Sequence, residues 1–308
     1  MTAFVFPGQG SQYAGMGKDL AENFPLARLT FEEANDALGI DLAKMCFEGP
    51  EEDLKLTANT QPAIVAASIA ALRVLQDETG LTPTCVAGHS LGEYAALVCA
   101  GAFSFEDSIR TVRKRGMFMQ DAVPVGVGTM AAIIGLDNQI VDQICQDVAN
   151  DEIVAPANYN SPGQIVIAGH VSAVQRAMEL SKERGAKRAL PLPVSAPFHC
   201  MLMKPAASQL ETVLAGVDVG ELTCPVVSNV DAIANREAGL VRDLLVRQVY
   251  SPVRWEESVV AMVDSGVERF VEIGPGKVLA GLIKRIAKGS DIQNIGTVAD
   301  LKAFSPAP

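Results

Sequence analysis

This chain of 308 residues has few histidines, no closely spaced pairs of cysteines and few long apolar runs. The longest nearly uninterrupted apolar stretch, from Ala63 to Leu72, is about half the length of a membrane-spanning helix. The first residues, Met1 to Pro7, contain no basic segment and no apolar core of signal-peptide length. We therefore expect a cytoplasmic protein that does not insert into a membrane.

The few cysteines and histidines do not form the patterns of metal sites or disulfide frameworks. None of the six cysteines belongs to a C-x-x-C motif, and the three histidines are not clustered. This spacing predicts reduced core thiols, with no metal site and no disulfide. A formal net charge of −11 argues against a nucleic acid as partner.

What remains is the composition of an ordinary soluble globular protein, with 49% hydrophobic and 20% charged residues. At this length, one large domain with a smaller insert fits better than one compact unit. Apolar patterning predicts an α/β arrangement in the large part. Its predicted strands are 4–6, 84–87, 226–228 and 270–273, and its main predicted helices are 24–38, 61–78 and 105–120.

The middle of the chain follows a different order. After the turn-rich segment 123–128, residues 129–192 predict the succession β-α-β-β-α-β, which is typical of a ferredoxin-like subdomain. Its predicted strands are 129–134, 153–157, 164–168 and 188–192, and its predicted helices are 139–149 and 172–184. We therefore expect an α/β-hydrolase-like catalytic domain at 1–124 and 196–308, with a ferredoxin-like insert at 125–195. A cleft should lie between the two.

Ser90 lies in Gly88-His89-Ser90-Leu91-Gly92, the G-x-S-x-G pattern of a nucleophile elbow. A short predicted strand precedes the motif, and the apolar face of a helix follows it. On such a turn the serine points outward, and its Oγ lies at a helix N-terminus whose free N–H groups can receive an oxyanion. The pattern predicts a nucleophilic Ser90; the alternative is a serine that only caps the helix.

Among the three histidines, His199 is the expected base. His89 is adjacent to the nucleophile but diverges from it on the turn, and we expect it to anchor the loop. His170 ends a strand of the insert, where a surface or capping role is expected. His199 lies where the chain re-enters the large domain and follows the serine, as in α/β hydrolases; its alternative is a buried histidine bound by backbone groups. Between the two residues, the insert holds the acids Asp137, Asp142, Asp147, Asp151 and Glu152, mostly on helix faces or turns. A Ser–His dyad oriented by a backbone carbonyl therefore fits better than a triad.

Eight short motifs resemble those of the malonyl-CoA:acyl-carrier-protein transacylases and the acyltransferase domains of fatty acid and polyketide synthases. They occur in the right order and span nearly the whole chain. They are 6–12, 60–63, 88–94, 115–120, 158–164, 197–199, 248–255 and 272–276.

The resemblance implies a ping-pong malonyl transfer with no bound cofactor. Ser90 would attack the thioester carbonyl of malonyl-CoA, and His199 would take its proton. The backbone N–H groups of Gln9 and Leu91 would form the oxyanion hole, and the backbone carbonyl of Gln248 would orient the histidine. The malonyl group would then pass to the phosphopantetheine thiol of acyl carrier protein and supply fatty acid synthesis.

The resemblance also assigns substrate-binding residues. Arg115 belongs to a helical run of four cations, which by itself is typical of a solvated surface. Helical spacing separates it by about 200° from the arginine two residues earlier, so the two side chains can face different ways. The resemblance places Arg115 against the malonyl carboxylate. Phe198 would crowd an α-methyl group, which favours malonyl over methylmalonyl. Gln61 and Asn160 are further candidates for substrate contact, and each could equally be a turn or cap residue.

Alternative functions and the mode of partner binding remain open at this point. A serine thioesterase or other hydrolase shares the elbow but does not call for a cation in the acyl pocket. A trans-acting acyltransferase of a polyketide synthase would have the same sequence features, and a non-catalytic scaffold protein would show no covalent labelling of Ser90 by an acyl group.

We expect a monomer. Because the chain and carrier proteins are both acidic, we expect the carrier protein to dock through local basic residues. The candidates are Lys182, Arg184, Lys187 and Arg188 on the insert, and Lys284 and Arg285 near the C-terminus.

Overall fold

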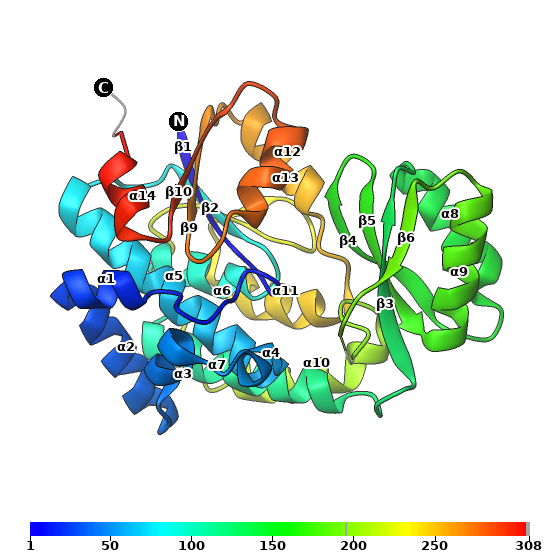
Figure 1. The fold of residues 1–308 in the computed structure, drawn as a ribbon, viewed down its shortest axis with the longest axis horizontal. Helices are drawn as coiled ribbons and strands as arrows, with labels where there is room; N and C mark the ends of the chain where they lie inside the picture. The colour runs from blue at the N-terminus through cyan, green and yellow to red at the C-terminus, as the bar shows by residue number, and fades with distance from the viewer. Residues whose placement is uncertain (195, 306–308) are drawn as a thin grey trace.

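In the computed structural model, which describes residues 1–194 and 196–305, the chain forms two lobes, each built on its own β-sheet (Figure 1). Neighbouring strands of the larger sheet run parallel, except that the final short strand is antiparallel to its neighbour. In spatial order the strands are β10 (Asp291–Ile295), β9 (Arg269–Ile273), β1 (Thr2–Phe6), β2 (Cys85–Gly88), β7 (Val226–Val227) and β8 (Ala234–Asn235).

Helices cover both faces of this sheet, because alternate strand residues point to opposite sides. Phe4 and Phe6 of β1 belong to the apolar core that includes α5 (Thr57–Thr79), a helix buried along most of its length. Ala3 and Val5 belong to a second core, with α12 (Trp255–Asp264) and α13 (Val278–Ile286). The remaining helices of this lobe are α1 (Lys18–Asn23), α2 (Pro25–Leu38), α3 (Leu42–Glu48), α4 (Glu51–Lys55), α6 (Gly92–Cys99), α7 (Phe105–Asp121), α10 (Lys204–Leu214), α11 (Ala238–Tyr250) and α14 (Val298–Ala303).

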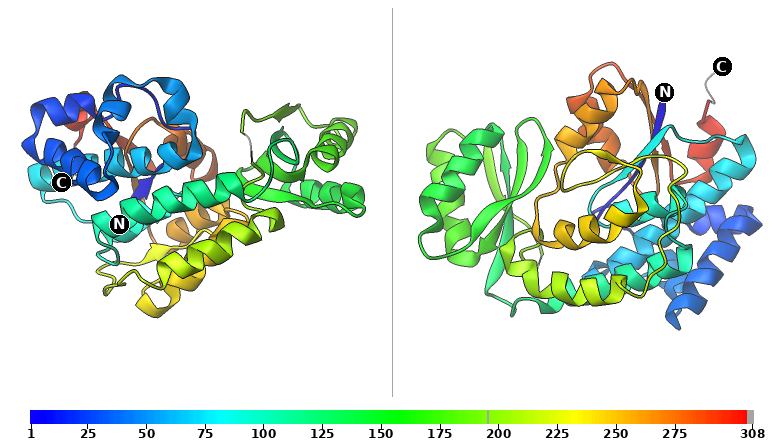
Figure 2. Two further views of the ribbon diagram at one scale, coloured as in Figure 1. Left: turned by 90° about the horizontal axis from the view of Figure 1, so that it is seen from below. Right: turned by 180° about the vertical axis from the view of Figure 1, so that it is seen from behind.

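The smaller lobe is a four-stranded antiparallel sheet with two helices packed against it, and Figure 2 shows it projecting from one side of the larger lobe. Along the chain it comprises β3 (Gly128–Ile134), α8 (Asn138–Ala149), β4 (Val154–Ser161), β5 (Gln164–His170), α9 (Val171–Glu183) and β6 (Arg188–Pro191). The spatial order β4-β5-β3-β6 is that of the β-α-β-β-α-β unit. The predicted α/β fold with a parallel sheet and a separate ferredoxin-like unit is therefore confirmed.

Strand β4 connects the two lobes by backbone hydrogen bonds. The N–H of Tyr159 donates to the carbonyl of Val253 at 2.9 Å, and the N–H of Val253 donates to the carbonyl of Ala157 at 2.8 Å. The sequence predicted that this strand would end at Ala157; it runs on through Ser161 instead. The extension places the segment 158–161, expected near a turn, in a strand that lies against the larger lobe.

Three other segments differ from the prediction. Strand β7 is followed by β8 in a tight antiparallel hairpin before the next helix begins, and β10 is an edge strand that the sequence did not reveal. The sequence predicted a loose tail from residue 304 onward, but Phe304 and Ser305 are bound to the larger lobe: the Arg269 guanidinium lies 5.0 Å from the ring of Phe304 and also donates to the carbonyl of Ser305. The last residues, 306–308, lie outside the described part of the chain, as does residue 195 at the predicted domain boundary. The domain limits stay a prediction.

Among the described residues, no helix is long and apolar enough to cross a membrane.

Candidate active site

The nucleophile elbow joins the end of β2 to the start of α6. Ser90 has a φ of 51°, in the left-handed region that is unfavourable for a residue with a side chain. A Cβ on Gly88 would lie 1.9 Å from the carbonyl carbon of Gly92, and a Cβ on Gly92 would lie 2.2 Å from the carbonyl oxygen of Phe6. Only glycine fits at either position, which explains the G-x-S-x-G spacing in steric terms.

Ser90 and His199 form a hydrogen-bonded pair. Ser90 Oγ lies 2.8 Å from His199 Nε2, and His199 Nδ1 lies 2.8 Å from the backbone oxygen of Gln248. Because a carbonyl can only accept, Nδ1 carries the proton and Nε2 is free to accept the serine proton. Burial, and next the positive charge of Arg115, lowers the pKa of His199 to about 3, so the imidazole is neutral near pH 7. The orienting group is the backbone carbonyl that the resemblance implied.

The other two histidines form no hydrogen bond with the nucleophile among the described residues, although His89 is its neighbour in the chain and lines the same pocket. His89 Nε2 is 2.9 Å from Asn160 Oδ1, and burial lowers the pKa of this imidazole. His170 Nδ1 accepts a hydrogen bond from the N–H of Ile153 at 2.9 Å. His89 thus contacts a residue of the smaller lobe, and His170 bonds to the backbone within its own lobe.

Arg115 is a buried cation beside the nucleophile. Its side chain is 1% exposed, and Nη2 lies 3.1 Å from Ser90 Oγ. Its other partners are neutral amide oxygens: Oε1 of Gln61 at 2.7 Å and Oε1 of Gln248 at 2.8 Å. Within residues 1–194 and 196–305 no carboxylate forms an ion pair with Arg115. A buried guanidinium held only by neutral groups is well suited to bind a carboxylate ligand.

A pocket of about 560 Å³, its open mouth included, lies between the two lobes at the Ser–His pair. Its lining includes most of the predicted site residues, together with apolar side chains of the smaller lobe. Gln248 lies behind this lining, and Asn160 contacts His89 while its neighbour Asn158 faces the pocket. The lining residues are Gln9, Gln61, His89, Ser90, Leu91, Arg115, Met119, Met130, Asn158, Leu192, Val194, Phe198 and His199.

Two backbone N–H groups are placed to receive an oxyanion. Gln9 and Leu91 both line the pocket, and in the described part of the chain neither backbone N–H has a hydrogen-bond acceptor. Gln9 lies in the loop after β1, and Leu91 lies after β2, where α6 begins. Strands β1 and β2 are neighbours in the sheet, so the two N–H groups are close to each other. These are the two N–H groups predicted to form the oxyanion hole, and that role stays a prediction.

Sequence analysis missed two buried polar residues behind the elbow, Glu93 and Asn229. Asn229 Oδ1 accepts from the N–H of Ser90 at 2.7 Å, and Glu93 Oε2 accepts from the N–H of Asn229 at 3.0 Å. Burial raises the pKa of Glu93 to about 7. For Glu93, the available signal in the sequence was a charged residue within the apolar run of the elbow helix. No group of three metal-ligating side chains occurs among the residues that the structure describes.

Comparison with known proteins agrees with this geometry. The model of the acyl transferase domain family matches residues 3–303. The chain is 55% identical over 284 residues to the malonyl CoA-acyl carrier protein transacylase of Escherichia coli K12, covering 92% of each chain. It is 52% identical over 285 residues to that of Bacillus subtilis, covering 92% of this chain and 90% of the relative.

Solved structures give the same result. An acyl carrier protein S-malonyltransferase from Vibrio cholerae superposes with a TM-score of 0.96 at 52% identity, covering 99% of both chains. A malonyl-transacylase solved in complex with a type II PKS acyl-carrier protein also has a TM-score of 0.96, at 53% identity over 98% of both chains. The chain therefore belongs to the acyl transferase domain family, among its malonyl CoA-acyl carrier protein transacylases, and is an acyltransferase.

Proposed function

We propose that the chain transfers a malonyl group from malonyl-CoA to the phosphopantetheine thiol of acyl carrier protein through a malonyl ester of Ser90. The observation that carries the proposal is the buried Arg115 guanidinium, 3.1 Å from the serine hydroxyl and bound there by neutral groups. An acyl group with a carboxylate supplies the anion that this cation can bind. The names of the curated relatives support the same donor and acceptor.

The first half-reaction forms the acyl-enzyme. Ser90 Oγ bonds to the thioester carbonyl carbon while its proton passes to His199 Nε2. The carbonyl oxygen becomes an oxyanion near the N–H groups of Gln9 and Leu91, where loss of one donor typically costs about 10²–10³ in rate. The carbon–sulfur bond then breaks, and CoA leaves as a thiol with the proton that His199 returns. The carrier thiol attacks the ester by the reverse path, which gives ping-pong kinetics.

Arg115 links acyl recognition to the strength of the base. Gln61 and Gln248 hold its guanidinium through oxygen atoms and leave its charge uncompensated. The malonyl carboxylate offsets the charge that lowers the pKa of His199, so binding of the right acyl group makes the imidazole a stronger base. An acetyl group leaves the cation unpaired and is rejected. Phe198 lines the same pocket, and its bulk favours malonyl over methylmalonyl.

The wider setting follows from this chemistry. Each step uses side chains and backbone groups of the chain, so we expect no resident cofactor or metal. We assign the enzyme to fatty acid synthesis, as a cytoplasmic monomer. A trans-acting role for a polyketide synthase is the second candidate, because one close structural relative was solved with a type II PKS carrier. Transfer rates to holo carrier proteins of the two pathways distinguish these assignments.

Intact-protein mass spectrometry after brief exposure to malonyl-CoA tests the proposal. We expect a malonyl adduct on Ser90 that clears when holo carrier protein is added, and no adduct with acetyl-CoA. Arg115→Ala should lose the malonyl adduct, whereas Lys114→Ala, an exposed cation on the same helix, should retain it. An adduct that clears in buffer alone would assign a hydrolase, and no adduct with any acyl-CoA would exclude acyl transfer.

A further inference from the structure

Asn229 lies behind the nucleophile elbow and binds the two peptide groups that lead into Ser90, one on each side of His89. Its Oδ1 accepts from the N–H of Ser90 at 2.7 Å, and its Nδ2 donates to the carbonyl oxygen of Gly88 at 2.6 Å. The left-handed backbone of a non-glycine residue such as Ser90 persists only where its surroundings enforce it. The Asn229 side chain is fully buried and spans the peptide groups that must be held.

Gln248 holds the other side of the same residue. Its Nε2 donates to the carbonyl oxygen of Ser90 at 3.0 Å and to Glu93 Oε2 at 2.8 Å. The same Glu93 oxygen accepts from the N–H of Asn229, so one buried carboxylate joins the two amide side chains. Because the backbone oxygen of Gln248 also orients His199, this network fixes the nucleophile and the base relative to each other.

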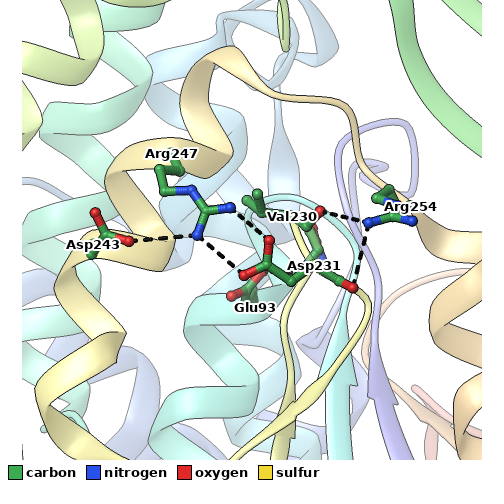
Figure 3. Close-up of polar contacts among 7 residues, drawn as sticks. Glu93, Val230, Asp231, Asp243, Arg247 and Arg254 are labelled. Carbon is green, nitrogen blue, oxygen red and sulfur yellow. Dashed lines mark hydrogen bonds and ion pairs between the residues drawn. The ribbon is translucent and has the colours of Figure 1, made fainter.

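The loop that carries Asn229 is fastened to the helix that carries Gln248 (Figure 3). Both terminal nitrogens of Arg247 bind the carboxylate of Asp231, at 2.6 and 3.1 Å, and one of them lies 3.5 Å from Asp243. Arg254 Nη1 lies 3.5 Å from the carbonyl oxygens of residues 230 and 231, and its backbone N–H donates to the carbonyl of Asn229 at 3.0 Å. Ala232, in the same loop, has a φ of 53°. The loop therefore has one tightly constrained conformation.

We propose that Asn229 is a positioning residue for acyl transfer, which holds the two peptide groups that precede Ser90 so that Oγ stays aligned with His199 Nε2 and the oxyanion-hole N–H groups. The inference rests on the proposed function, because it assigns Asn229 a part in that reaction. A positioning role predicts a fall in kcat with little change in KM, because no atom of Asn229 lines the acyl pocket. A shift of about 1 Å in a reacting group typically costs roughly 10² in rate.

Asn229→Asp is the sharpest test. The substitution keeps the shape and the acceptor toward Ser90 but replaces the donor toward Gly88 with a carboxylate oxygen. We expect kcat to fall by roughly 10² at pH 8, with KM for malonyl-CoA within about threefold of the parent value. Protonating the new carboxyl restores a donor, so activity relative to the parent should rise as the pH falls toward 5. A purely structural role would not give this recovery.

The matched control is Asn235→Asp, on the same hairpin, where the side chain bonds only to residue 237 among the described residues. The melting temperature of each variant is measured alongside the kinetics.

Labelling of Ser90 by a small sulfonyl fluoride is a second, independent measurement. It needs the aligned Ser–His dyad but no recognition of the malonyl group, so it tests Asn229 even if malonylation fails in the parent enzyme. Slow labelling in Asn229→Asp supports the inference; labelling and kcat at parent levels overturn it. If that variant does not fold, Asp231→Asn loosens the loop instead, and a parent-level kcat there overturns the inference.

Discussion

The glycine after Ser90 gives the clearest prediction at the scale of single residues. In Gly92→Ala the new methyl group would lie 2.2 Å from the carbonyl oxygen of Phe6 and 2.8 Å from that of Pro7, both backbone atoms that cannot turn away. We expect a loss of about 3–5 kcal/mol in the free energy of unfolding, at the upper end for single substitutions. Denaturant unfolding monitored by circular dichroism measures the loss.

Gly281→Ala is the matched control for that experiment. Gly281 lies within α13, and a Cβ there would meet no atom within 4 Å. Its substitution should raise stability by about 0.5–1 kcal/mol, because alanine is the better helix former. Equal effects at the two glycines would mean that the elbow can adjust to a side chain.

The dyad could be predicted from sequence at this scale, whereas its support could not. Ser90 and His199 carry local signatures: two flanking glycines in one case, and the return from the insert in the other. Asn229 binds the elbow although it lies 139 residues away from Ser90 in the sequence. Glu93 supports the elbow from within the apolar helix α6. The local pattern around Asn229 does not distinguish a hydrogen-bonding role from an ordinary turn position, and the only local signal for Glu93 is its charge within an apolar run.

At the scale of elements, the link between β9 and α13 depends on one buried carboxylate. Glu272 is 0% exposed and accepts hydrogen bonds from the N–H groups of Leu279 and Ala280, in the first turn of α13, and from Asn294 Nδ2 on β10. Carboxylates at helix N-termini are favourable. Burial nevertheless outweighs these contacts and raises the pKa of Glu272 to about 7.

This shift gives a signed prediction for stability against pH. Between the ordinary carboxyl pKa and pH 7, the folded state binds a proton at Glu272 that the unfolded state does not. The group's contribution to stability is therefore largest at low pH and is lost as the pH rises from about 4.5 to about 7. Glu272→Gln removes this titration, so its stability deficit relative to the parent should be larger at pH 5 than at pH 7.

Thermal unfolding in a series of buffers between pH 5 and pH 7 measures this difference. Glu268→Gln, an exposed acid just before the same strand, is the control and should follow the parent curve. A deficit that is constant over this range would show that Glu272 is ionised throughout.

Element prediction succeeded where periodicity was strong and failed where backbone pairing alone defines the strand. The helices α5, α7, α8 and α9 were predicted to within a few residues, because their apolar positions recur at helical spacing. Strand β10 has the mixed sequence DIQNI and is defined by its pairing with β9. Strand β4 extends past its predicted end because β5 pairs with it as far as Ser161, and Val253, nearly a hundred residues later, adds hydrogen bonds at Ala157 and Tyr159.

At the scale of the whole molecule, the pocket exists because the two lobes are held at a fixed angle. Besides the β4 contacts, Arg285 Nη1 on the larger lobe donates to Gln164 Oε1 on the smaller lobe at 2.7 Å. A Cβ on Gly128 would lie 2.3 Å from Pro197 Cγ, so the two connecting segments pass in close contact. Sequence patterns predicted both lobes and a cleft between them. They could not predict how the lobes pack, because these contacts pair residues far apart in the chain.

The same arrangement favours one of the predicted basic groups as the docking site for the acidic carrier. Lys187 and Arg188 are exposed and, in the part of the chain that the structure describes, form no ion pair. Arg188 begins β6 and Lys187 directly precedes it, while Leu192 and Val194, just beyond the other end of that strand, line the pocket. Arg184 is instead paired with Asp147 at 3.0 Å, and Arg285 with Gln164.

We expect the double variant Lys187→Glu/Arg188→Glu to raise KM for holo carrier protein by roughly tenfold or more at low salt. The net charge of −11 repels an acidic partner at long range, so docking depends on this local patch, and added salt should narrow the difference from the parent. Malonylation of Ser90 by malonyl-CoA, followed by mass spectrometry, separates carrier docking from any effect on the donor. Lys284→Glu, an exposed cation on α13 that lacks the interlobe contact of Arg285, is the comparison: a larger rise in KM there would place the carrier on α13.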